Sequence, residues 1–342
     1  MEEAVRKNIR PRSILQFVGQ AAVIRQVQVA LASAKARKDA FPHTIMSGPP
    51  GLGKTTLAEI ISGEMGVDPI CIMAGAMRDG ADVDNVLGKL PYDGYGKKGE
   101  VEDCSKIKFG VLFIDEIHQM GKKTMELMHT ALEDYTVSLN KFHNGKVQPV
   151  KCWIPKFTMI TATNYLGSLP RPFVDRFMLH LNFQAYEIED MVNVIRFSSG
   201  KMNMTLSDEA CLKLASNSRG VPRIANRYLF KARDTSIFEG GDGENIGIEC
   251  VEKMFDINKI DSIGLSDVDR KVLKYLARMD RPVGLETVAH GIDEDPDTVE
   301  NYVEPWLMKL GMIARTGQGR VVTEYGISHL GSDQQMCGLR PM

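Results

Sequence analysis

A phosphate-binding loop at residues 48–55 constrains the fold of this chain more than any other feature of its sequence. The residues read Gly-Pro-Pro-Gly-Leu-Gly-Lys-Thr, a full match to the pattern G-x-x-x-x-G-K-[ST]. Such a loop holds phosphate where a buried strand leads into the N-terminus of a helix. The β-rich residues 44–47 predict that strand, and residues 55–65 predict the helix. The sequence therefore predicts a nucleotide-binding α/β domain.

The loop residues suit a triphosphate and its metal ion. Gly48, Gly51 and Gly53 allow the backbone N–H groups to approach the phosphates closely. Lys54 is expected to reach the β- and γ-phosphates, and Thr55 to offer its hydroxyl to Mg²⁺. We therefore expect ATP and Mg²⁺ as cofactors. The loop residues expected to bind nucleotide are Gly48, Pro49, Pro50, Gly51, Leu52, Gly53, Lys54, Thr55 and Thr56.

A second motif, Val-Leu-Phe-Ile-Asp-Glu at residues 111–116, ends an apolar strand on two acids. The strand would deliver Asp115 beside the phosphate loop, where its carboxylate could position Mg²⁺ or a water bound to it. Glu116 would polarise the attacking water. Two acids can also simply terminate a strand, but with the loop present the Asp-Glu order favours hydrolysis over phosphoryl transfer to a small metabolite.

Strand-like and helical segments alternate as far as residue 183, which predicts a parallel sheet covered by helices. Residues 188–254 have helical periodicity throughout. Residues 266–330 read as three helices followed by two short strands around residues 316–319, the order of a winged helix. The predicted fold class is an α/β P-loop ATPase domain with a parallel sheet, then an all-α lid domain and a C-terminal winged helix. The expected boundaries are 1–183, 184–260 and 261–330, with a flexible tail at 331–342.

Composition sets limits on partners and location. The formal net charge is −2, so a large basic nucleic-acid surface is not expected, and any DNA contact must depend on local patches or ring geometry. None of the six cysteines forms a C-x-x-C pair, which favours reduced thiols in a cytosolic protein. Residues 1–12 lack the apolar core of a signal peptide, and no apolar run approaches the roughly 18 residues of a membrane span. We expect a cytoplasmic protein without membrane contact.

Four segments in collinear order resemble the RuvB family, the bacterial Holliday-junction branch-migration motors of the AAA+ superfamily. The resemblance extends from about residue 10 to about residue 323. The segments are the loop 48–56, Asp-Glu-Ile-His at 115–118, Glu-Asp-Tyr at 133–135 and Gly-Val-Pro-Arg-Ile-Ala-Asn-Arg at 220–227. The last of these and the Asp-Glu-Ile-His segment are much more specific than the loop alone.

The resemblance implies roles for residues outside the loop. Asn164 would be a first sensor that reads the γ-phosphate through the attacking water. Arg176 would be an arginine finger that reaches the nucleotide of the next subunit, and Arg223 a second sensor that closes the lid over the γ-phosphate. Isolated arginines can instead form surface salt bridges. The residues implied to surround the adenine are Arg10, Pro11, Phe17, Val18, Tyr186 and Pro222.

The resemblance also implies partners. The protein would form a homohexameric ring on duplex DNA and move a four-way junction. Arg315 and Arg320, on the strands of the wing, would contact phosphates, although winged helices also bind proteins. A hairpin at residues 137–155, turning at Asn144-Gly145, would dock a junction-binding partner resembling RuvA. Trp153 is either an anchor of that interface or a local core residue.

The chain departs from the family pattern at four places. Gly317 and Gln318 replace the usual Pro and Arg of the wing tip, so weaker phosphate binding is expected. Val174 replaces a frequent arginine near the finger, and the hairpin has its own mixture of apolar and basic residues. An insertion at 91–99 precedes the Asp-Glu strand; its Tyr95, Lys97 and Lys98 either contact DNA or a partner in the ring channel, or belong to a solvated loop.

Three alternatives remain open from the sequence alone. A clamp-loader-like or remodelling ATPase would hydrolyse ATP to release a protein partner, without movement along DNA. A viral or mobile-element motor would work in a host cytoplasm with a different junction protein, as the altered hairpin allows. A non-hydrolysing DNA-binding scaffold is disfavoured because the loop and the Asp-Glu pair are both intact.

Overall fold

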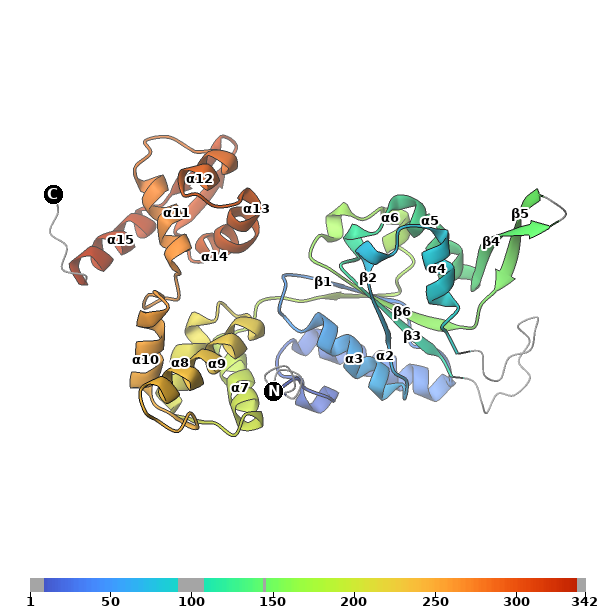
Figure 1. Ribbon diagram of the computed structural model, residues 1–342, viewed down its shortest axis with the longest axis horizontal. Coiled ribbons are helices and arrows are strands. Elements are labelled where there is room, and N and C mark those ends of the chain that lie inside the picture. The colour runs from blue at the N-terminus through green and yellow to red at the C-terminus, as the bar shows by residue number, and fades with distance from the viewer. Residues whose placement is uncertain (1–8, 92–107, 144–145, 337–342) are drawn as a thin grey trace. The chain divides into compact units, whose positions relative to one another are not determined.

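The computed structural model describes residues 9–91, 108–143 and 146–336. It divides into two compact units. The first contains residues 1–202 and the short segment 220–224, and the second contains residues 203–219 and 225–342. Each unit is described by itself below (Figure 1). The insertion at 91–99 and the turn at Asn144-Gly145 lie outside the described residues, apart from Pro91.

The first unit is built on a five-stranded parallel sheet in the order β2-β3-β6-β1-β7. Strands β3 and β6 lie inside the sheet and are buried along nearly their whole length, which explains why their sequences are apolar or β-branched throughout. The predicted parallel sheet is confirmed. The strands are β1 (Thr44–Ser47), β2 (Ile70–Met73), β3 (Gly110–Asp115), β6 (Phe157–Thr163) and β7 (Leu179–Asn182).

Helices cover both faces of this sheet, with α2 and α3 on one side and α4, α5 and α6 on the other (Figure 1). The core on the second side joins buried residues of α4 and α5 to those of β3 and β6. Helix α4 begins at a capping box, in which the Asp79 carboxylate accepts from the Ala81 and Asp82 amides. The helices are α2 (Ala21–Arg37), α3 (Lys54–Glu64), α4 (Gly80–Leu87), α5 (Lys122–Asp134), α6 (Arg171–Val174) and α7 (Ile188–Lys201).

The predicted hairpin is present as the antiparallel pair β4 (Thr136–His143) and β5 (Lys146–Trp153), which projects beyond the sheet (Figure 1). Its base is anchored in the core because Val137 and Ile154 are buried there. Trp153 is half-buried at the same end, opposite Thr136 in the register. The hairpin is therefore held at its base by apolar packing.

The second unit begins with the helices α8 (Asp208–Asn217), α9 (Pro222–Phe238), whose first three residues belong to the first unit, and α10 (Ile248–Ile257). A two-residue parallel pair, β8 (Thr205–Leu206) and β9 (Asn245–Ile246), corrects the prediction that this segment is all-helical. The pair forms because the Asp242 carboxylate turns the chain by accepting from the Glu244 and Asn245 amides.

The rest of the second unit is the predicted winged helix, with its own core. A π-helical turn, η5 (Val299–Val303), precedes Pro305, which has no N–H to donate within the helix and would crowd the carbonyl four residues earlier. Helix α15 continues to Met336, so residues 331–336, expected in a flexible tail, are helical. The remaining elements are α11 (Asp267–Ala277), α12 (Leu285–Gly291), α13 (Pro296–Thr298), α14 (Glu304–Lys309), β10 (Ile313–Thr316), β11 (Gly319–Val322) and α15 (Glu324–Met336).

Among the helices of the described residues, none is both long and apolar enough to cross a membrane.

Candidate active site and wing

The phosphate loop leaves β1 at Ser47 and enters α3 at Lys54, as the sequence predicts. Gly48, Gly51 and Gly53 all have positive φ angles, of 131°, 82° and 102°. A Cβ at Gly48 would lie 2.3 Å from the Phe183 carbonyl oxygen, so backbone packing also requires glycine there. The loop therefore has backbone conformations that residues with a Cβ rarely adopt. Pro49 and Pro50 lie exposed at the outer edge of the loop, whereas Leu52 is buried.

The Lys54 side chain is folded back into the loop. Its Nζ donates to the carbonyl oxygens of Gly48 and Pro49, at 2.5 and 2.8 Å, and to Oδ1 of Asn164, at 2.9 Å. Only 8% of the residue is exposed. Burial lowers the pKa of Lys54 to about 8; the nearby Arg223 charge acts in the same direction, and Asp115 and Glu116 oppose it. The ammonium therefore lies where hydrogen-bond acceptors converge.

Two oxygen-bearing side chains lie together at the start of α3 and the end of β3. The Thr55 hydroxyl lies 3.3 Å from Oδ2 of Asp115, and Oδ1 of the same carboxylate accepts from the Glu116 amide at 3.0 Å. These hard oxygens suit Mg²⁺, which takes one or two protein ligands and completes its shell with water and phosphate oxygens. Among the described residues, no group of three or more His, Cys, Asp or Glu could hold a metal ion by itself. The site fits Mg²⁺ that arrives with a nucleotide.

Glu116 follows the strand in a left-handed conformation, with φ of 54°. Its Oε2 accepts from Nε2 of Gln119 at 2.7 Å and lies 3.7 Å from Nε2 of His118. Nδ1 of His118 lies 3.1 Å from the Thr163 hydroxyl at the end of β6. The carboxylate is thus oriented by its own 3₁₀ turn, η3 (Ile117–Gln119), and by the neighbouring strand. We did not predict the contact of Gln119, although the residue stands only three positions after Glu116.

The residues expected to surround the adenine approach the loop from two distant segments. The Tyr186 hydroxyl donates to the Leu52 carbonyl at 3.2 Å, and burial raises the pKa of this phenol. Phe17 is buried, and a Cβ at Gly53 would lie 3.0 Å from its ring. The structure therefore brings Phe17 and Tyr186 to the same side of the phosphate loop.

The remaining residues of the expected adenine segment lie around this contact. Val18 follows Phe17 and is half-buried, as are Pro11 and Pro222. Arg10 forms an exposed ion pair with Glu59 of α3, at 3.3 Å, and lines a shallow cleft with Pro11 and Ile60. The Arg10 side chain is therefore held at α3 by its ion pair with Glu59.

Arg223 lies against the phosphate loop. Its amide donates to the Gly51 carbonyl at 3.3 Å, and a Cβ at Gly51 would meet the Arg223 Cβ at 2.9 Å. The Arg223 charge contributes to the lowered pKa of Lys54, which places the guanidinium in electrostatic reach of the same site. Lys54, Asn164, Thr55, Asp115 and Arg223 therefore form one cluster in the first unit.

Arg176 does not belong to that cluster. Its guanidinium donates to the Pro172 carbonyl at 2.6 Å and pairs with Glu133 of α5 at 2.9 Å. About a quarter of the Arg176 side chain is exposed. The residue therefore makes its own set of contacts in the first unit, with part of its side chain exposed.

The two wing arginines have different environments. Arg315 and Arg320 are register partners in the β10–β11 pair. Arg315 is exposed and pairs with Glu300 of η5. Arg320 is only 8% exposed and grips the buried Glu304 with two hydrogen bonds, of 2.5 and 3.2 Å. The structure thus contradicts the prediction that Arg320 contacts DNA phosphates. Its guanidinium is buried and hydrogen bonded to Glu304, which joins the wing to α14.

Three family profiles together match nearly the whole chain. The Holliday junction DNA helicase RuvB P-loop domain matches residues 9–183, the RuvB AAA lid domain residues 186–261, and the RuvB C-terminal winged helix domain residues 262–331. The Holliday junction branch migration complex subunit RuvB of Pediococcus pentosaceus is 36% identical over 341 residues, which cover 98% of this chain and 95% of that protein. The protein of the same name from Prochlorococcus marinus is 37% identical over 338 residues, 98% of this chain and 91% of its own length.

A solved structure agrees with these matches. The chain is similar to the Thermotoga maritima RuvB Holliday junction branch migration motor with a TM-score of 0.79 and 32% sequence identity, over 95% of this chain and 98% of that one. The similarity covers both units, so it is not confined to the P-loop domain.

Proposed function

Since the chain belongs to the RuvB family, we propose that it is an ATP-driven motor that moves Holliday junctions in DNA recombination and repair. The family consists of AAA+ ATPases, so this chain binds and hydrolyses ATP. The finer proposal is that hydrolysis drives translocation of duplex DNA. The observation that supports the hydrolysis step is the cluster at the ends of β3 and β6, where a P-loop lysine, a pair of oxygens suited to Mg²⁺ and an oriented glutamate converge. The coupling to DNA rests on the winged helix and on the family match.

Each member of the cluster has a definite task in this proposal. Lys54 exchanges its carbonyl partners for phosphate oxygens and offsets the charge that develops on them. Glu116, held by Gln119, orients and polarises the attacking water. Asn164, already hydrogen bonded to Lys54, senses whether the γ-phosphate is present. Mg²⁺, held by Thr55 and Asp115, would supply further neutralisation of phosphate charge.

The adenine would lie between Phe17 and Tyr186, both buried beside the loop. We propose that Arg223 acts from the other side as the second sensor, because its amide is bonded to the loop itself. We further propose the division of labour expected from sequence: residues 1–183 as the ATPase domain, 184–260 as the lid and 261–330 as the DNA-binding winged helix.

We propose a ring of identical subunits, in which the partly exposed Arg176, bonded in its own subunit to Pro172 and Glu133, would complete the nucleotide site of a neighbour. A hexamer follows from the family resemblance. The β4–β5 hairpin, anchored at its base and extended beyond the sheet, would dock a RuvA-like junction-binding protein. We propose that this assembly acts in the cytoplasm, on nucleoid DNA.

A clamp-loader-like or protein-remodelling role is not favoured, since the matches carry the name RuvB over almost the entire chain. The two classes differ in what stimulates the ATPase. A DNA motor turns over continuously on duplex DNA, whereas a remodelling switch turns over once for each partner released. Steady-state ATP hydrolysis with a closed circular duplex, compared with no DNA, separates them. Continuous stimulation supports the proposal, and turnover that ignores DNA contradicts it.

A further inference from the structure

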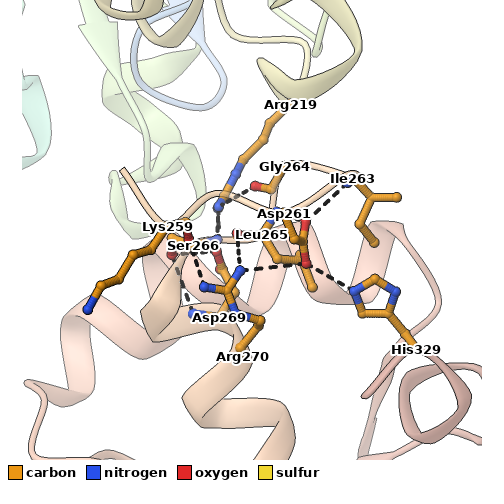
Figure 2. A network of polar contacts seen from close by, with 10 residues as sticks. All are labelled: Arg219, Lys259, Asp261, Ile263, Gly264, Leu265, Ser266, Asp269, Arg270 and His329. Carbon is orange, nitrogen blue, oxygen red and sulfur yellow. Dashed lines mark hydrogen bonds and ion pairs between the residues drawn. The ribbon is translucent and has the colours of Figure 1, made fainter. Parts of the chain in front are cut away.

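Arg219, the last residue before the segment 220–224 that belongs to the first unit, is held by the winged helix. Its guanidinium binds both carboxylate oxygens of Asp269 in α11, with Nη2–Oδ2 at 2.5 Å and Nη1–Oδ1 at 3.4 Å, and also donates to the Gly264 carbonyl at 3.1 Å (Figure 2). The same guanidinium lies 5.7 Å from the centre of the Trp306 ring in α14. One side chain thus joins the end of the lid helix α8 to two helices of the winged helix.

This ion pair is buried. The Arg219 side chain is 12% exposed and that of Asp269 is 1% exposed. Asp269 also completes the capping box of α11 by accepting from the Ser266 amide and hydroxyl, both at 2.6 Å. A carboxylate so fully desolvated depends on its charged partner. A movement of the α11 N-terminus therefore carries Arg219 with it.

The connection from lid to winged helix is pinned by a second set of contacts. The Asp261 carboxylate accepts from the Ile263 and Leu265 amides and lies 3.0 Å from Nε2 of His329 (Figure 2). Arg270 reaches back from α11 to the carbonyls of Leu265 and Lys259. These bonds fix the linker backbone against the winged helix, on the same side as the contact between Arg219 and Gly264.

The residues directly after Arg219 are bonded to the ATP site. The Gly220 carbonyl accepts from the Tyr186 amide at 2.9 Å, and the Arg223 amide donates to the Gly51 carbonyl. Arg219 and Gly220 both have positive φ, of 58° and 69°, and a Cβ at Gly220 would lie 2.6 Å from the Tyr186 carbonyl oxygen. The segment 220–224 therefore belongs to the first unit, although the residues on both sides of it belong to the second.

We propose that Arg219 is a positioning residue that couples the winged helix to the second-sensor segment. The winged helix holds the Arg219 side chain, the ATP site holds the next residue, and one peptide bond joins the two. Displacement of α11 when the winged helix engages DNA would shift residues 220–223 against Gly51, and a change at the γ-phosphate would shift Arg219 in return. This inference rests on the proposed function, since it assumes that the winged helix carries the DNA.

The test uses the full-length double variant Arg219→Gln/Asp269→Asn, which replaces the ion pair by a neutral pair and leaves no buried charge unpartnered. Lys271→Gln is the matched control, because it removes an exposed cation from the same helix. We expect the KM and kcat of DNA-free ATP hydrolysis to stay within about twofold of wild type, with thermal unfolding close to wild type. The stimulation by duplex DNA should fall about fivefold or more, the lower range of a coupling effect. Normal stimulation in the double variant would overturn the proposal.

A second measurement does not depend on DNA. The chain has two tryptophans, so Trp153→Phe leaves Trp306 as the only one, beside Arg219. We expect Trp306 emission to differ between the ADP state and a non-hydrolysable ATP analogue in this background, and the difference to vanish with Arg219→Gln/Asp269→Asn. If Trp306 emission in the Trp153→Phe protein is the same with ADP and with the ATP analogue, the coupling is contradicted, even if DNA stimulates the ATPase. A nucleotide-dependent signal without DNA stimulation would refute the proposed motor and keep the coupling.

Discussion

Nζ of Lys54 lies 2.9 Å from Oδ1 of Asn164, although 110 positions separate the two residues in the chain. The contact exists because β1 and β6 are adjacent parallel strands, with Ser47 paired to Thr163, so that both chains leave the sheet at the same edge. The group expected to bind phosphate and the group expected to sense it are therefore hydrogen bonded to each other. A γ-phosphate that attracts the ammonium must also disturb Asn164.

The lowered pKa of Lys54 predicts proton uptake on ATP binding. Burial lowers this pKa to about 8, so the nucleotide-free protein loses the Lys54 proton above that pH. Bound phosphates favour the charged form and raise the pKa again, so binding at pH 8.5 should take up most of a proton, and binding at pH 6.5 almost none. Calorimetry in two buffers of different ionisation enthalpy measures this difference. The control is Lys54→Arg, which is charged at every pH used and should show no proton uptake from this position. Equal proton uptake at both pH values in the wild type would refute the assignment of the proton to Lys54.

The surface position of Arg176 predicts complementation between two inactive variants. Arg176→Ala should bind ATP but hydrolyse it slowly, and Lys54→Ala should lack a working phosphate loop while keeping its finger. In a random equal mixture of subunits in a ring, about a quarter of the interfaces join an intact loop to an intact finger. The mixture should therefore regain a corresponding part of the ATPase activity, measured after co-assembly. If mixing restores nothing, Arg176 does not act on a neighbour.

The two arginines of the wing should differ in what their substitution changes, DNA binding for Arg315 and stability for Arg320. Arg315 is exposed, so Arg315→Ala should weaken duplex binding and lower the slope of log affinity against log salt by about one. Glu300→Gln releases Arg315 from its ion pair and should strengthen binding. Arg320→Ala leaves the buried Glu304 without its partner and should instead destabilise the winged helix, by about 3–5 kcal/mol. Fluorescence anisotropy at several salt concentrations and thermal unfolding separate these outcomes; a folded Arg320→Ala protein that loses the salt slope would contradict the structural role.

Buried His43 predicts that the first unit loses stability in mild acid. Nδ1 of His43 accepts from the Met159 amide at 2.9 Å, and burial lowers its pKa from 6.5 to about 4. The unfolded chain therefore binds the proton first, so the stabilisation is complete above pH 6.5 and falls as the pH drops toward 4, by roughly 3 kcal/mol in all. His43→Asn keeps an acceptor and removes the titration. Between pH 7 and pH 5 the Tm of wild type should therefore fall by more than the Tm of His43→Asn. Equal falls in Tm for the two proteins would exclude the effect.

The sequence predicted that Lys54, Asp115 and Asn164 would meet at one edge of the sheet, because short-range patterns position each of them. A glycine-rich loop with Lys54 can only leave one edge of a parallel sheet, and the apolar strand before Asp115 must end at that same edge. The position of Asn164 after β6 follows from the same rule. These residues meet because strand direction, and not detailed packing, brings them together.

Other features depend on tertiary packing and could not be predicted. Arg320 looked like a phosphate contact because it flanks a flexible tip, but its fate depends on Glu304, sixteen positions earlier on a different element. Arg219 stands next to the second-sensor segment in the sequence, yet only the folded structure shows that Asp269, fifty positions later, holds it. Long-range ion pairs of this kind leave no periodic signal. The π turn before Pro305, by contrast, has a local cause that is visible in the sequence, because proline has no backbone N–H to donate within the helix.

The most direct test of the motor is branch migration of a synthetic four-way junction with homologous arms, alone and with a junction-binding partner. We predict that wild-type protein with ATP and Mg²⁺ converts the junction into two duplexes. The Glu116→Gln variant, which would lack the group proposed to polarise water, should bind ATP and DNA but move the junction about a hundredfold more slowly or not at all. ATP hydrolysis on duplex DNA without any junction movement, with or without the partner, would contradict it.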